Sequence, residues 1–398
     1  MDNHDHRMLG PRLDLFHQQE EAPGTAFWHP RGATIYRLIE NYIRRAMNCA
    51  GFQEVRTPQL LSRSLWERSG HWGKFGANMF VFSDGDRSFA LKPMNCPGHV
   101  QLFRQQIRSY RDLPVRFSEF GACHRYEPSG ALHGLMRSRA FTQDDAHVFC
   151  LPEHIEAEVE RFCGLLRRVY ARFGFQDFVV GFSTRPEARE GSDATWDEAE
   201  ATLAAAARGA GLEFRHQPGE GAFYGPKLEF ILKDQDGREW QCGTIQLDLV
   251  LSEKLDAEVV DASGARVRPA MIHHAVLGSV ERFMAVLLEH HRGQLPFWLA
   301  PEQLVIAPVS ADQSEYARAV AATFNAADLR CVVDDADETL SRRIVSAHDQ
   351  GVPIFVTVGP KEVSAGTVTI RERGGQRSVL SLTEARDWLK ELAAPDAA

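Results

Sequence analysis

Residues 123–150 read CHRYEPSGALHGLMRSRAFTQDDAHVFC and form the densest polar stretch of the chain. The stretch combines arginines, a glutamate, three histidines and a Gln-Asp-Asp run with strand-like ends. Solvated loops rarely combine such groups with two phenylalanines, Phe141 and Phe149. The segment therefore indicates a candidate functional site framed by strands.

The sequence on either side of this segment predicts a sheet with helices packed against it. Short apolar runs broken by Gly, Pro and Asp favour a largely antiparallel sheet with one intervening helix at Val100–Tyr110. Apolar residues at helical spacing predict helices over residues 34–50 and 152–172. Strand-like alternation returns over residues 222–250, and residues 271–291 read as strand, glycine and helix. Runs of strands with appended helices indicate an α+β domain.

The segment GFQEVRTPQLL, residues 51–61, follows the first of these helices. Pro58 has no backbone N–H to donate to a β-ladder, so it marks the end of a strand or the edge of a sheet. We expect an edge here, where a partner can pair.

A second domain is predicted after Pro301, where the rhythm of the sequence changes. Strands at LVIAPV, LRCVV and PIFVTVG alternate with helices over residues 312–326 and 338–350. Strict alternation of β and α elements indicates a doubly wound α/β sheet with both faces covered. The predicted division is 1–300 and 301–398.

Composition limits the classes of function. The 398 residues include 45 basic and 54 acidic side chains, a net charge of −9, so a nucleic-acid partner needs a local basic surface. The seven cysteines form no C-x-x-C pair, which argues against a disulfide framework and for a reducing compartment. Because neither a signal peptide nor about 18 consecutive apolar residues occur, we expect a soluble cytoplasmic protein with no membrane contact.

The sequence contains neither G-x-x-x-x-G-K-[ST] nor a G-x-G-x-x-G after a strand, so ATP would have to be bound by other means. RYEPSGALHGLMRSRAFTQDDAHVF resembles motif 2 of the class II aminoacyl-tRNA synthetases in their threonyl form. The resemblance continues in LDLFHQQEEAPGTAFWHPRG, LWERSGHW, KPMNCPGH, AFYGPKLEF, WQCGTIQLD and IHHAVLGSVERF. It implies a class II antiparallel-sheet catalytic domain with a C-terminal anticodon-binding-like α/β domain.

The resemblance implies a zinc site at Cys96, His147 and His273, with His273 rather than His274 as the ligand. Three protein ligands leave positions open for substrate. Taken singly, each residue is as well explained as a buried core residue. The zinc would bind the amino group and hydroxyl of threonine, which rejects valine but admits serine. By similarity, Asp145 accepts from the hydroxyl, and the pocket is lined by Gln143, Tyr224 and Gln246.

The resemblance also implies an ATP site. Arg125 would hold the α-phosphate and the amino-acid carboxylate, Glu127 would accept from the adenine amino group, and Phe141 would stack on the ring. Outer phosphates, with Mg²⁺, would lie against Arg137 and Arg282. Gln241 completes the predicted ATP contacts. The alternative for these arginines is ordinary pairing with surface carboxylates.

Two further residues and an assembly follow from the same resemblance. His71 would help to remove the proton of the ribose hydroxyl during transfer, although a histidine beside Trp72 also suits a packing role. Lys227 would contact phosphate or ribose, or is a surface lysine. The segment around Pro58 matches motif 1, a dimer-interface element, which predicts a two-fold homodimer.

The sequence departs from the family in two places. The catalytic signature begins at about His6, so we expect no editing domain, measurable serine activation and a free-standing editing protein as a partner. The stretch DDADETLSRRIV keeps four family positions, Asp334, Glu338, Arg343 and Ile344, but has Ala336, Thr339, Ser341 and Val345 where the family has arginine, lysine, glycine and arginine. Fewer cations should weaken anticodon binding.

These features predict a threonine-tRNA ligase that forms threonyl-adenylate and passes threonine to tRNA(Thr). A synthetase paralogue that loads threonine onto a carrier protein or small molecule is the alternative, as is an inhibitor-insensitive second copy. A non-catalytic regulatory paralogue is a further possibility. The retained Arg125, Glu127 and Arg282 argue against it.

Overall fold

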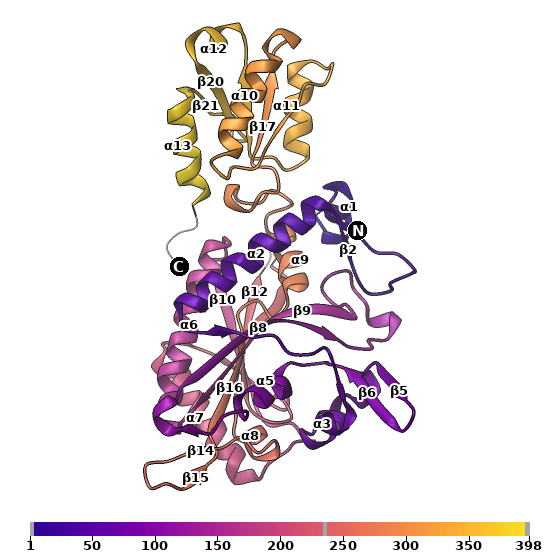
Figure 1. Cartoon of the computed structure of the whole chain (residues 1–398), viewed down its shortest axis with the longest axis vertical. Helices are drawn as coiled ribbons and strands as arrows, with labels where there is room; N and C mark the ends of the chain where they lie inside the picture. The colour runs from indigo at the N-terminus through magenta and orange to yellow at the C-terminus, as the bar shows by residue number, and fades with distance from the viewer. Residues whose placement is uncertain (1–3, 234–236, 395–398) are drawn as a thin grey trace. The chain divides into compact units, whose positions relative to one another are not determined.

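A computed structural model describes residues 4–233 and 237–394 of the chain (Figure 1). Within these residues the chain packs into two compact units. One comprises residues 18–25 and 40–286, and the other comprises residues 4–17, 26–39 and 287–394. Across the described ranges, no helix has the length and apolar character needed to cross a bilayer. The predicted boundary at residue 300 stays a prediction.

The larger unit is built on an eight-stranded sheet in the order β11-β10-β12-β13-β16-β9-β8-β3. Pairing is antiparallel except at the two edges, where β3 pairs with β8 and β11 with β10 in parallel. The expectation of a largely antiparallel sheet is confirmed. The bounds of the strands are β3 Gln53–Glu54, β8 Val115–His124, β9 Ala140–Cys150, β10 Phe178–Ser183, β11 Arg215–Gln217, β12 Lys227–Lys233, β13 Glu239–Asp248 and β16 Ala270–Ala275.

Helix α6 (Ile155–Arg172) covers one face of this sheet and shows which way its side chains point. The ring of Phe162 packs against Phe230 and His274, with centroids 5.6 and 4.6 Å apart. Since neighbouring side chains of a strand point to opposite faces, His273 lies on the face away from α6. His274 is therefore a core residue beneath α6, and the side chain of His273 lies on the opposite face of the sheet.

The helix expected at Val100–Tyr110 lies earlier, because α5 spans Cys96–Phe103. Pro97 suits the first turn of a helix, where no backbone N–H is needed, so the helix begins before the apolar run. Helix α7 (Asp193–Gly209) was not expected; its alanine-rich stretch carries little periodicity. Smaller elements complete the unit: β4 Leu60–Ser62, α3 Arg63–Arg68, α4 His71–Phe75, β5 Val81–Asp84, β6 Arg87–Leu91, β7 Arg108–Ser109, α8 Leu251–Lys254, β14 Val259–Val260 and β15 Arg266–Val267.

The second unit contains a five-stranded sheet in the order β18-β17-β19-β20-β21. Helices α10 and α13 pack on one face and α11 on the other, as the alternating pattern predicts. The three predicted strands β17, β18 and β19 are parallel, as a doubly wound sheet requires. Two further strands follow: β20 pairs antiparallel with β19, and β21 pairs antiparallel with β20. The bounds are β17 Leu304–Pro308, α10 Ser314–Asn325, β18 Cys331–Val333, α11 Leu340–Asp349, β19 Ile354–Val358, α12 Pro360–Ala365, β20 Thr367–Glu372, β21 Arg377–Ser381 and α13 Leu382–Ala393.

The same unit includes the described N-terminal elements α1 (His6–Arg12), β1 (Phe16–His17) and β2 (Phe27–Trp28). The division between the units falls within two helices, α2 (Pro30–Cys49) and α9 (Val280–His290). The segment between β1 and β2, residues 18–25, packs with the larger unit, although both strands belong to the second. Three separate parts of the sequence thus form the second unit.

Candidate active site

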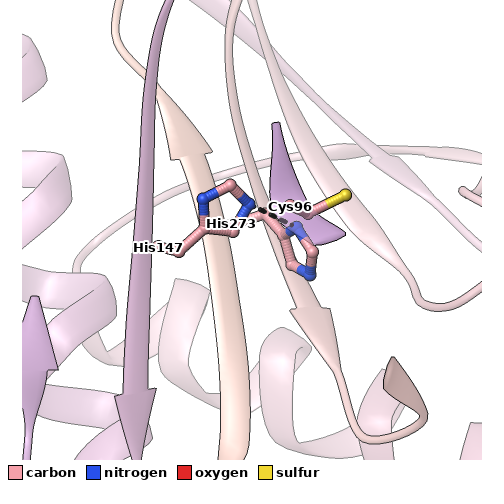
Figure 2. A group of neighbouring side chains, drawn as sticks. All are labelled: Cys96, His147 and His273. Atoms are coloured by element: carbon pink, nitrogen blue, oxygen red, sulfur yellow. Dashed lines mark hydrogen bonds between the residues drawn. The ribbon is translucent and has the colours of Figure 1, made fainter. Parts of the chain in front are cut away.

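Cys96, His147 and His273 meet on the face of the large sheet away from α6 (Figure 2). His147 and His273 are paired across β9 and β16, and Cys96 opens α5. One ligand atom from each of the three side chains lies within 4.8 Å of the others, and all three residues are buried. His147 Nε2 and His273 Nδ1 are 2.9 Å apart. The structure brings the three predicted ligands together.

The remaining ring nitrogens of both histidines are already engaged. His273 Nε2 lies 2.9 Å from the carboxylate of Asp248, and His147 Nδ1 lies 2.8 Å from His99 Nδ1. His99 Nε2 in turn contacts Glu119 at 3.1 Å. Such partners orient metal-binding imidazoles and leave the facing nitrogens for a cation. A soft sulfur with two imidazoles suits Zn²⁺.

Cys96 is a thiol rather than a thiolate in this environment, because burial and the carboxylates of Asp145 and Asp248 raise its pKa well above the ordinary value. A bound cation reverses this preference and deprotonates a coordinating thiol. Burial also lowers the pKa of His147, which keeps the imidazole neutral and able to coordinate. The donor set therefore fits a divalent metal.

His71 lies against this cluster, not apart from it. Its Nε2 is 3.2 Å from Cys96 Sγ and its Nδ1 is 2.8 Å from Ser69 Oγ. The side chain is fully buried, and burial lowers its pKa to about 3. The ring also packs edge-on to Phe223. The sequence left open a packing role and a role in proton removal; these contacts fit the packing role, and proton removal stays a prediction.

The side chains expected around the amino acid surround the cluster. Tyr224 stacks its ring on His273 with centroids 4.7 Å apart, and its hydroxyl donates to Gln246 Oε1 at 2.6 Å. Asp145 Oδ1 lies 3.9 Å from His147 Nε2. Gln143 accepts from the thiol of Cys123 at 3.4 Å. Gln143 and Asp145 lie on β9, Gln246 lies on β13, and Tyr224 lies three residues before β12; their roles toward the amino acid stay predictions.

Asn95 is a residue that the sequence reasoning missed. Its Nδ2 donates to Asp145 Oδ2 at 2.9 Å, and its Oδ1 accepts from Cys123 at 3.6 Å. The amide fits only because residue 121 is glycine: a Cβ there would lie 2.2 Å from Asn95 Oδ1. Its position beside the predicted ligand Cys96 was the available signal.

Arg125 and Phe141, both predicted ATP contacts, lie against each other. The guanidinium lies over the Phe141 ring, 5.0 Å from its centroid, and donates to the carbonyl of Pro93 at 3.3 Å. Arg282, near the start of α9, donates to the carbonyls of Met136 at 3.0 Å and Gln241 at 3.3 Å. The first bond ties α9 to the polar loop between β8 and β9, and the second ties it to β13.

Two predicted cations are paired with carboxylates. Arg137 Nη2 lies 2.8 Å from Glu127 Oε2, so two predicted ATP contacts bind each other. Lys227 is ion-paired with Glu229, which also accepts from Gln241 Nε2 at 3.0 Å. Pairing with a carboxylate is the alternative that the sequence left open for the arginines, and Arg137 shows it. The side chain of Lys227 is partly buried rather than that of a surface lysine. A nucleotide bound here would exchange these pairs for its own phosphates and base.

In the second unit, the altered stretch surrounds the start of α11. Arg343, only 5% exposed, is bound to Asp334 Oδ2 at 3.0 Å and to the carbonyl of Pro308 at 2.9 Å. Arg318 faces Asp335 at 3.4 Å, and Arg342 faces Glu338 at 3.3 Å. The one arginine retained from the family pattern is therefore occupied within the fold.

Comparison with known families agrees with this architecture. Residues 79–291 match the model of the tRNA synthetase class II core domain (G, H, P, S and T), and residues 303–392 match an anticodon binding domain. The fold and these matches define a class II synthetase core followed by an anticodon-binding α/β domain.

Curated relatives make the assignment more specific. The chain is 54% identical over 394 residues to the threonine–tRNA ligase of Rhodospirillum rubrum, covering 98% of this chain and 61% of that one. The ligase of Gluconacetobacter diazotrophicus is also 54% identical, with 98% and 62% covered. A crystal structure of the RNA binding domain of threonyl-tRNA synthetase from Cryptosporidium parvum superimposes with a TM-score of 0.95 at 38% identity, covering 99% of both chains.

The chain belongs to the threonine–tRNA ligase family of class II synthetases. It spans about 60% of the length of these curated relatives.

Proposed function

We propose that this chain activates threonine with ATP to threonyl-adenylate and transfers the threonyl group to tRNA(Thr). The observation that carries the proposal is the buried Cys96, His147 and His273 cluster with Asp145 beside it. A metal ion beside a hydrogen-bond acceptor can recognise the hydroxyl group of a substrate. Threonine has this group on its β-carbon, whereas valine has a methyl group in its place.

Zn²⁺ is the proposed metal, with one ion per subunit held by Cys96, His147 and His273. When bound, it supplies a Lewis-acid centre for the amino and hydroxyl groups of threonine. Asp145 accepts from the hydroxyl, while Tyr224 and Gln246 close the pocket on the side of β13. Gln143 lies on the same strand as Asp145, two residues away. An analogue without the hydroxyl would deprive the buried carboxylate of Asp145 of one donated hydrogen bond and leave it with the one from Asn95.

Adenylate formation needs positioning and charge neutralisation more than covalent assistance. The threonine carboxylate attacks the α-phosphorus in line, and pyrophosphate leaves. Arg125 holds the carboxylate and the α-phosphate, and Phe141 stacks on the adenine. Glu127 accepts from the adenine amino group. Outer phosphates bind Mg²⁺, Arg137 and Arg282, with Gln241 alongside.

In the transfer step, the 3′ ribose hydroxyl of tRNA attacks the carbonyl carbon of threonyl-adenylate, and AMP leaves. We propose that His71 takes part in removing the proton of that hydroxyl, since its imidazole Nε2 contacts the cluster at Cys96 Sγ. Lys227 is proposed to contact phosphate or ribose after release from Glu229.

The organisation of the protein follows the same proposal. We assign residues 1–300 to the catalytic domain and 301–398 to the anticodon-binding domain. β3 lies at the edge of the large sheet, where motif 1 would pair two copies as a homodimer.

The seven cysteines are free, which fits the reducing cytoplasm. A separate protein that hydrolyses seryl-tRNA is a further proposed partner, because the zinc site admits serine.

The proposal is tested by assaying one zinc-loaded preparation for threonine-dependent ATP–pyrophosphate exchange and for charging of a tRNA(Thr) transcript. We expect both activities, and we expect Arg125→Ala to abolish both. Arg111→Ala, at an exposed arginine outside the site, is the matched control and should leave both unchanged. Exchange without charging would favour the carrier or small-molecule acceptor, and neither activity would overturn the proposal.

A further inference from the structure

We propose that Arg139 is a positioning residue for ATP, held in place by Gly24 of the distant segment 18–25. The inference rests on the proposed function and deepens it, because it adds residues that set ATP affinity. Arg139 was not among the predicted site residues. It lies in the polar loop between β8 and β9, one residue before β9 begins.

The main chain and side chain of Arg139, at the end of this loop, bind the residues at its start. Its carbonyl accepts from the backbone N–H of Arg125 at 2.9 Å. Its Nε donates to the carbonyl of Glu127 at 2.8 Å, and Nη2 donates to Ser129 Oγ at 3.2 Å. The guanidinium also lies over the Tyr126 ring, 5.1 Å from the centroid. Arg139 thus fixes the backbone of the residues expected to hold the α-phosphate and adenine.

These residues need such support, because no strand holds them. β8 ends at His124 and β9 begins at Ala140, so Arg125 and Glu127 lie outside the ladder. Groups that bind a reacting substrate must be held to within a fraction of an ångström, and loops are less exact than strands. The forked guanidinium of Arg139 donates hydrogen bonds to this loop in place of those that a neighbouring strand would provide.

Segment 18–25 supports Arg139 from the other side. The backbone N–H of Arg139 donates to the carbonyl of Gly24 at 2.7 Å. Gln18 Nε2 reaches the carbonyl of Gly134 at 3.4 Å, further along the same loop. Within the segment, Thr25 Oγ1 donates to the carbonyl of Ala22 at 2.7 Å. The segment therefore contacts the loop at two points and is braced by a turn of its own.

Gly24 is required at this contact for two reasons. Its φ is +78°, which a residue with a Cβ rarely adopts. A Cβ would also lie 3.0 Å from Leu132 Cδ2 and 3.1 Å from Arg139 Cγ. Gly24→Ala would push the segment away from Arg139 without removing a side chain from the ATP site.

The test measures ATP affinity by calorimetry, and separately the KM values for ATP and threonine in pyrophosphate exchange. We expect Arg139→Ala to weaken ATP binding about tenfold or more and to raise the KM for ATP more than the KM for threonine, whose carboxylate also binds Arg125, with the zinc content unchanged. Arg139→Lys should fall between Ala and wild type, because a lysine cannot reproduce the fork. Gly24→Ala should act in the same direction.

Arg111→Ala serves as the control and should bind ATP like the wild type. The inference is overturned if Arg139→Ala binds ATP normally, or if it raises both KM values equally with a loss of thermal stability. Because calorimetry reports ATP binding without turnover, a chain that binds ATP but shows no threonine-dependent exchange would refute the proposed function alone.

Discussion

His147 and His273 face each other across neighbouring strands with their inner ring nitrogens 2.9 Å apart, and each has its outer nitrogen bound by another side chain. Because their outer nitrogens are bound, neither imidazole ring can rotate away from Cys96, the third candidate ligand. The pairing register of β9 and β16 therefore determines that these two histidines face each other in the candidate metal centre.

Asp248→Asn should weaken metal binding without removing a ligand. The carboxylate lies 2.9 Å from His273 Nε2 and orients that ring, and loss of such a partner costs about 10- to 100-fold in metal affinity. Zinc content after dialysis against a graded chelator series measures the change. Asp84→Asn, at an exposed aspartate, is the control. Equal zinc retention in both variants would contradict the role of Asp248.

Asp145→Asn should reduce the discrimination between threonine and valine. The carboxylate is buried and would lose one donated hydrogen bond with valine, keeping the one from Asn95, whereas an amide tolerates that loss better. We expect kcat/KM for threonine to fall by about 100-fold and the ratio of threonine to valine to shrink, as in sites built to read a hydroxyl. Steady-state exchange with each amino acid checks this. An unchanged ratio would rule out Asp145 as the acceptor.

Glu119 should make stability depend on acid pH. Burial alone would raise its pKa, but hydrogen bonds from His99 and Thr57 and the charge of Lys92 lower it from 4.5 to about 2. A lowered pKa means that the ionised carboxylate stabilises the fold above the pKa of the unfolded chain, near 4.5. This stabilisation is lost as the pH falls from there toward 2.

Glu119→Gln removes this dependence, so the difference in unfolding free energy between wild type and variant should shrink as the pH falls below 4.5. At neutral pH we expect the variant to be less stable by about 3 kcal/mol, because Lys92 loses its buried partner. Urea unfolding at several pH values measures both. A difference that stays constant with pH would contradict the assignment.

Arg343→Ala should destabilise the second unit, since its buried guanidinium binds Asp334 and the carbonyl of Pro308. Breaking such a buried pair costs about 3 to 5 kcal/mol. Arg342→Ala, next to it but exposed, should change stability by no more than about 0.5 kcal/mol. Urea unfolding of the two variants makes the comparison. If Arg343→Ala were equally stable but bound tRNA less tightly, the residue would serve RNA rather than the fold.

The sequence predicted the candidate site better than it predicted how the site is held. The motifs of the family identified Cys96, His147 and His273 as candidate metal ligands, and the structure brings them together. Asp248 and His99 were missed, because an outer partner of an imidazole is defined by strand register and ring rotation. Neither leaves a motif in the sequence. The loop contact of Gly24 with Arg139 joins residues more than a hundred positions apart and was equally invisible.

The fold shows the same division. Apolar periodicity located α6 and the alternating elements of the second unit, because one face of each is buried. It placed α5 too late, since the first turn is specified by Pro97 rather than by apolar spacing. It also could not distinguish parallel from antiparallel addition of β20 and β21. The apolar pattern of a short strand is the same whether it runs parallel or antiparallel to its neighbour.

The central claim, that the Cys96, His147 and His273 cluster makes this chain an activator of threonine, is tested most directly by ATP–pyrophosphate exchange. The zinc-loaded chain is assayed with threonine, serine and valine at equal concentrations. The account predicts exchange with threonine, exchange with serine lower by about 10- to 200-fold for the missing methyl group, and none above background with valine. Valine exchange comparable to that with threonine, or no exchange with threonine, would contradict it.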